Sequence, residues 1–96
     1  MLGASAMIDG LGVEYVGGVC PVEAEGSIDG HRFYFYARGA RWSLGIGGSD
    51  PTESADWYYE EPYGQSKSAA GFMKEEEAIA LIRKAMLMFR AENEAA

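Results

Sequence analysis

Cys20 and His31 are the residues best suited to nucleophilic catalysis. They are the single cysteine and the single histidine of the 96-residue sequence. A thiol becomes a strong nucleophile when a nearby imidazole takes its proton. Cys20 precedes a proline without the local sequence of a cysteine protease, and the spacing indicates no orienting partner for His31. We therefore predict that the protein is not an enzyme and has no catalytic residue.

Metal and phosphate sites are not indicated either. One cysteine and one histidine are too few for a zinc site. The acidic residues in the range 50–61 lack the ligand spacing of an EF-hand loop. The glycines of the range 45–48 follow a predicted strand, but no Lys-Ser or Lys-Thr pair and no predicted helix start follow them. We predict no metal and no cofactor.

Most of the net charge lies in one short segment. The chain has 15 acidic and 8 basic residues, a formal net charge of −7, and residues 50–66 contribute five acidic residues and no basic one. Aromatic residues anchor protein interfaces, and a local negative field attracts basic partners. The candidate partner-binding residues of this segment are Asp50, Glu53, Asp56, Trp57, Tyr58, Tyr59, Glu60, Glu61 and Tyr63. A solvated loop whose aromatic rings turn into the core is the alternative interpretation.

Two tight turns organise the residues before this segment. Asp29-Gly30 lies between alternating runs and favours a two-residue hairpin turn, because both positions tolerate positive φ. Gly39-Ala40 is suited to a second turn. The two turns predict one antiparallel meander over 21–28, 31–38 and 41–47. Both registers place the same residues on the core face: Val22, Ala24, Ile28, Phe33, Phe35, Trp42, Leu44 and Ile46.

The pattern changes to a helical period after Lys74. Apolar residues from Ala78 to Phe89 recur at helical spacing, and acidic residues occupy the first turn. We predict an α+β fold: an antiparallel β-meander of three to four strands, with one C-terminal helix packed on one face. Residues 56–60 are either the fourth strand or a loop with one turn of helix. The expected single domain 1–96 comprises a frayed start (1–11), the sheet (12–47), an acidic aromatic loop region (48–73) and the helix (74–93).

The second face of the predicted sheet is an alternative binding surface. It presents Tyr34 and Tyr36 side by side with Glu23 and Glu25 opposite them, and three arginines at its borders. Tyrosines on a half-solvated sheet face also occur simply because they favour strands. As a binding surface, this face would associate with itself or with another protein.

The composition excludes several classes of partner. A net charge of −7 disfavours direct binding to nucleic acid or to anionic lipid, since both require clustered basic residues. No run approaches the length of a membrane span. A single cysteine fits a reducing compartment. We expect a cytoplasmic protein whose partner is another protein, and a monomer or weak homodimer.

In its small size, its acidity and its acidic stretch from Asp50 to Glu61, the chain resembles the anti-CRISPR proteins of phages and mobile elements. The resemblance is one of overall character, with no shared motif from which residue roles could be carried over. It implies a non-enzymatic inhibitor in a bacterial host cell. Such an inhibitor would bind a CRISPR effector complex and block recognition of the target DNA or its PAM, with carboxylates in place of DNA phosphates.

Overall fold

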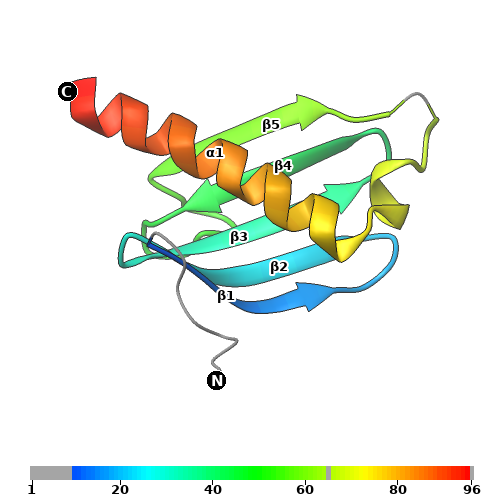
Figure 1. The fold of residues 1–96 in the computed structure, drawn as a ribbon, viewed down its shortest axis with the longest axis horizontal. Coiled ribbons are helices and arrows are strands. Elements are labelled where there is room, and N and C mark those ends of the chain that lie inside the picture. Colours follow the sequence, from blue (N-terminus) through cyan, green and yellow to red (C-terminus); the bar gives the residue numbers. More distant parts are fainter. Residues whose placement is uncertain (1–9, 65, 96) are drawn as a thin grey trace.

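The computed structural model of the chain describes residues 10–64 and 66–95. These residues form strands followed by a single turn of 3₁₀ helix and a long α-helix (Figure 1). The elements in chain order are β1 Leu11–Gly17, β2 Val22–Ile28, β3 His31–Arg38, β4 Arg41–Ile46, β5 Trp57–Pro62, η1 Ala70–Phe72 and α1 Glu75–Ala95. The fold is α+β, as predicted.

The strands form one antiparallel sheet in which chain order and spatial order are the same, β1-β2-β3-β4-β5. Asp29 and Gly30 close the first predicted turn with φ values of 50° and 86°. The turn aligns β2 with β3 in the predicted register, with Ala24 opposite Phe35. Gly39, at φ 68°, closes the second turn, and the register of β3 with β4 is also as predicted.

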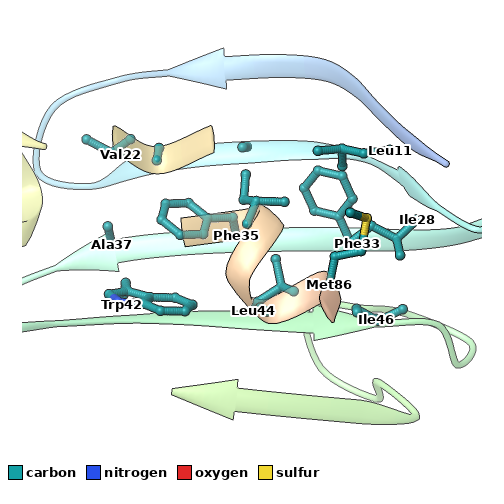
Figure 2. Packing of buried hydrophobic residues seen from close by; sticks show 14 of the residues in the cluster. Leu11, Val22, Ile28, Phe33, Phe35, Ala37, Trp42, Leu44, Ile46 and Met86 are labelled. Atoms are coloured by element: carbon teal, nitrogen blue, oxygen red, sulfur yellow. The ribbon is translucent and has the colours of Figure 1, made fainter. Parts of the chain in front are cut away.

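Helix α1 lies across one face of the sheet and forms the core with it (Figures 1 and 2). All eight residues predicted for the core face are buried. The buried side chains of the helix recur at helical spacing on one side: Ala78, Ile82, Ala85, Met86 and Phe89. Among the described residues, no helix is long and apolar enough to cross a membrane. The predicted range 74–93 for the helix differs from Glu75–Ala95 by one or two residues at each end.

The sheet has five strands, so the prediction of three to four strands is too low. The prediction that residues 1–11 are frayed is wrong at Leu11, which opens β1 and is buried; residues 1–9 lie outside the described range. The register of β1 with β2 shifts between Val13 and Tyr15, so Glu14 is not paired with a residue of β2. Such a bulge breaks the alternation of side chains that marks a strand in a sequence.

The fifth strand lies within the segment predicted as an acidic aromatic loop, 48–73. Residues 57–62 form β5, which pairs with β4. Half-buried and exposed positions alternate along it, with Trp57 and Tyr59 half-buried and Tyr58 and Glu60 exposed. This alternation is hidden in the sequence, because the exposed positions include a tyrosine and a half-buried position holds Glu61.

Candidate protein-binding face

The sheet face turned away from α1 is the candidate functional site, and we name it the outer face. Side chains alternate between the two faces of a sheet, so the residues between the buried positions point here. One row across all five strands runs through partner residues from β1 to β5. The outer face consists of Tyr15, Glu23, Glu25, Arg32, Tyr34, Tyr36, Arg38, Arg41, Ser43, Gly45, Tyr58 and Glu60.

Two tyrosines occupy the centre of the outer face. The rings of Tyr34 and Tyr36 lie with their centroids 6.1 Å apart and their planes inclined by 35°. The Tyr34 hydroxyl donates a hydrogen bond to Glu23 Oε1 over 2.5 Å. Partial burial and this carboxylate raise the pKa of Tyr34 well above its ordinary value. Tyr34 is therefore neutral and held in one orientation, which suits a preformed binding surface.

Two adjoining hollows lie over β4 on the outer face. Their volumes are about 440 and 290 Å³, and both are lined by Tyr36, Ser43 and Tyr58. Ser43 and Gly45 of β4 are small, whereas their partner residues on the neighbouring strands, Tyr36 and Tyr58 among them, are large and form the sides of the hollows. The larger hollow ends at Arg38 and Arg41. The smaller one ends at Tyr34 and the connection between β4 and β5.

The structure divides the predicted acidic aromatic site between the two faces of the sheet. Trp57 and Tyr59 point toward α1, with ring centroids 6.1 Å apart, and Trp57 meets the edge of Phe89 at 5.6 Å. Glu61 accepts hydrogen bonds from Lys84 Nζ at 2.7 and 2.9 Å and from the Tyr59 hydroxyl at 2.6 Å. The bonds from Lys84 and from Tyr59 lower the pKa of Glu61. These three residues of the predicted site hold the helix to the sheet.

Other residues of the predicted site have partners within the chain. On the outer face, Glu60 forms an ion pair with Arg41, Oε2 to Nη1 at 2.5 Å. A hydrogen bond with Glu77 raises the pKa of Tyr63 to about 12, so this residue joins the end of β5 to the first turn of α1. Tyr58 is the exception, since its side chain is 60% exposed and lines both hollows.

The remaining acidic residues, Asp50, Glu53 and Asp56, are exposed in the connection between β4 and β5. Asp50 accepts hydrogen bonds from the backbone N–H and the hydroxyl of Thr52, at 2.9 and 2.6 Å, and the pKa of Asp50 is lowered by them. Asp56 accepts a hydrogen bond from the Gly48 N–H at 3.1 Å. Among the described residues none of the three carboxylates has an ion-pair partner.

The residues considered for catalysis do not meet. Cys20 is exposed in the connection before β2, whereas His31 follows the turn at the other end of that strand. His31 instead meets the edge of the Phe89 ring, with centroids 6.0 Å apart. In the part of the chain that the structure describes, no three His, Cys, Asp or Glu side chains group as metal ligands do.

Sequence reasoning found the centre of the outer face but not its extent. The sequence predicts that Tyr34, Tyr36 and the three arginines lie there, as the structure has them. It does not indicate that Tyr15 and Ser43 belong to a site, and it groups Tyr58 with the acidic segment. The register of β1 and β5 was needed to bring Tyr15 and Tyr58 onto the same face.

Comparison of the chain with protein-family models, with curated proteins and with solved structures found no match. The chemistry of the outer face and of the exposed carboxylates is therefore what bears on function.

Proposed function

We propose that this chain is a non-enzymatic protein-binding module that engages its partner through the outer face. One observation supports this above the others: tyrosines line two open hollows on the sheet face that α1 does not cover. Tyrosine contributes a large contact area at low cost in side-chain entropy, and it is enriched among the residues that dominate binding energy. A groove between aromatic side chains also suits an extended peptide segment.

Tyr36 and Tyr58 are the anchor residues of the proposed interface. They lie diagonally across β4, Tyr36 opposite Ser43 and Tyr58 opposite Gly45, and both line the two hollows. A partner side chain in either hollow would contact both rings. A second copy of the chain is one partner that this face would accept, which makes self-association part of the same proposal.

The test compares a double variant, Tyr36→Ala with Tyr58→Ala, with the unchanged protein. Each tagged protein is used to capture partners from bacterial lysate, with identification by mass spectrometry, and its mass is measured by sedimentation over a range of concentrations. The control is Leu87→Ala, since this α1 side chain is 58% exposed and lies away from the outer face. We expect the double variant to lose the captured partner or the self-association that the control retains. Equal behaviour of both variants contradicts the proposal.

A second candidate is an inhibitor of the anti-CRISPR type that acts in the bacterial cytoplasm. It is favoured by the exposed carboxylates of Asp50, Glu53 and Asp56, which no cation neutralises among the described residues. A channel that binds nucleic acid is lined with Lys and Arg, and carboxylates placed there gain charge-assisted hydrogen bonds. Glu60 and Glu61 are less available for that role because each already pairs with a basic residue.

This candidate has its own variant, Asp50→Asn with Glu53→Gln and Asp56→Asn. Its matched control replaces the same number of exposed acidic residues on α1, Glu75, Glu76 and Glu92, with Gln. Capture from lysate that contains CRISPR effectors is run at low and high salt. If the inhibitor hypothesis is right, a nucleic-acid-binding complex is recovered at low salt with the control and not with the loop variant. Recovery with both variants excludes this use of the loop.

A further inference from the structure

Two arginines lie at one end of the larger hollow, although the chain as a whole is acidic. Arg38 and Arg41 are partner residues across β3 and β4, and both line the hollow. We name Arg38 and Arg41 the basic rim.

The basic rim is only partly neutralised by the chain itself. Arg41 pairs with Glu60, which also lines the hollow, but Arg38 has no ion-pair partner within the described residues. Like charges directly opposite each other on neighbouring strands destabilise a sheet. An anion bound between the two arginines removes that repulsion. Binding is then stronger, because it relieves a destabilisation that is present in the free protein.

The rest of the hollow supplies what a peptide needs beyond a charge. Tyr36 and Tyr58 provide ring faces for an extended chain, and Ser43 provides a hydroxyl at the floor. The volume of about 440 Å³ lies in the range of ligand-binding pockets. Guanidinium groups bind carboxylates with strong, directional hydrogen bonds.

We propose that the larger hollow binds an acidic peptide segment of a partner protein, with an Asp or Glu carboxylate at the basic rim and the adjoining residues between the two tyrosines. The inference rests on the proposed function of the outer face and names its partner chemistry. A segment with one or two carboxylates suits the site better than a nucleic acid, whose continuous phosphate charge is repelled by a chain of net charge −7. The same repulsion makes a second copy of the chain a weaker occupant of this hollow than such a segment.

The experiment selects short random peptides displayed on phage against four proteins. These are the unchanged protein, Arg38→Gln with Arg41→Gln, Tyr36→Ala with Tyr58→Ala, and the control Arg83→Gln, whose basic side chain is exposed on α1. We expect the unchanged protein and the control to enrich peptides that contain Asp or Glu. A synthetic peptide from that selection should bind the arginine variant about ten- to a hundredfold more weakly, measured by calorimetry.

A second measurement separates loss of binding from loss of fold. Because the arginines repel each other in the free protein, Arg38→Gln alone should unfold at the same or a slightly higher urea concentration than the unchanged protein. A marked fall in that midpoint contradicts the repulsion between the two arginines and the anion site inferred from it.

The outcomes distinguish this inference from the function on which it rests. Neutral or basic peptides that need the tyrosines but not the arginines overturn the acidic partner and leave the protein-binding face intact. If no peptide is enriched, both fail. Two results point to a different occupant and also overturn the inference: a dimer that is lost in the arginine variant, or an oligonucleotide that displaces the selected peptide.

Discussion

Gly45 determines how the connection between β4 and β5 lies on the outer face. A Cβ added to this residue would be 2.3 Å from the Pro51 carbonyl oxygen and 3.1 Å from the Ala55 Cβ. The connection therefore folds back against the middle of β4, where only a residue without a side chain leaves room for it. This contact places Pro51 and Thr52 at the edge of the smaller hollow.

Replacement of Gly45 by Ala should destabilise the fold by about 1–3 kcal/mol, as expected when extra atoms are forced into a filled space. The opposing atom belongs to the backbone, so the connection has to shift as a whole. Urea unfolding measures the loss. Ser43→Ala, two residues earlier on the same face, is the control and should change stability much less. Equal stabilities for both variants would show that the connection does not lie against β4.

Glu61 gives the stability of the protein a defined dependence on pH. Its bonds to Lys84 and Tyr59 hold its pKa below the ordinary value of 4.5 in the folded state. A depressed pKa contributes stability that is present above 4.5 and is lost as the pH falls through the folded pKa. Glu61→Gln should therefore be less stable than the unchanged protein at neutral pH, and the difference should shrink toward about pH 3. Urea unfolding of both proteins at the two pH values measures this, and a difference that does not change with pH contradicts it.

At the scale of the elements, polar contacts along α1 fix it over the sheet, beyond the bond between Tyr63 and Glu77 in its first turn. Lys84 bonds to β5 through Glu61 near the middle of the helix. Closer to its end, Arg90 donates two hydrogen bonds to the Asp29 carboxylate, from Nε at 2.9 Å and Nη2 at 2.7 Å. Asp29 is also the first residue of the turn between β2 and β3, so one residue shapes the hairpin and anchors the helix.

A double-mutant cycle should resolve the second contact. Asp29→Asn keeps a residue that tolerates positive φ but removes the charge, and Arg90→Gln removes the cation. For this partly exposed, two-bonded pair we expect a coupling energy of about 1 kcal/mol from urea unfolding of the two single variants and the double variant. A coupling near zero would mean that Asp29 acts through the turn alone.

The elements that the sequence predicts well are those whose signals are local. Asp29-Gly30 and Gly39 determine two turns, and the register, the core face and most of the outer face follow from them. The outer strands lack such a signal. A bulge at Glu14 disturbs the alternation of β1, and the ten-residue connection that precedes β5 requires the Gly45 contact, which joins residues on different elements. Because β1 and β5 lack a local signal, the sequence predicts two candidate sites where the tyrosines form one face.

At the scale of the molecule, the sheet order predicts which regions open last. Strands β2, β3 and β4 have a neighbour on both sides, whereas β1 and β5 have one each. Backbone amides in doubly paired, buried strands exchange with solvent only through larger unfolding events. Hydrogen exchange followed by NMR should find the slowest amides in β3, at the centre of the sheet. Slower exchange in β1 or β5 than in β3 contradicts this assignment of the stable core.

The order of the elements also has a consequence during synthesis. The helix that covers the core comes after every strand, so a ribosome delivers the complete meander before it delivers α1. In that interval the strands pair with neighbours already present, while the rings of Phe33, Phe35 and Trp42 have nothing to cover them. Exposed apolar surface of this kind attracts chaperones. Chains stalled before and after the release of α1 should differ in crosslinking to a ribosome-bound chaperone, with the shorter chain captured and the longer one free.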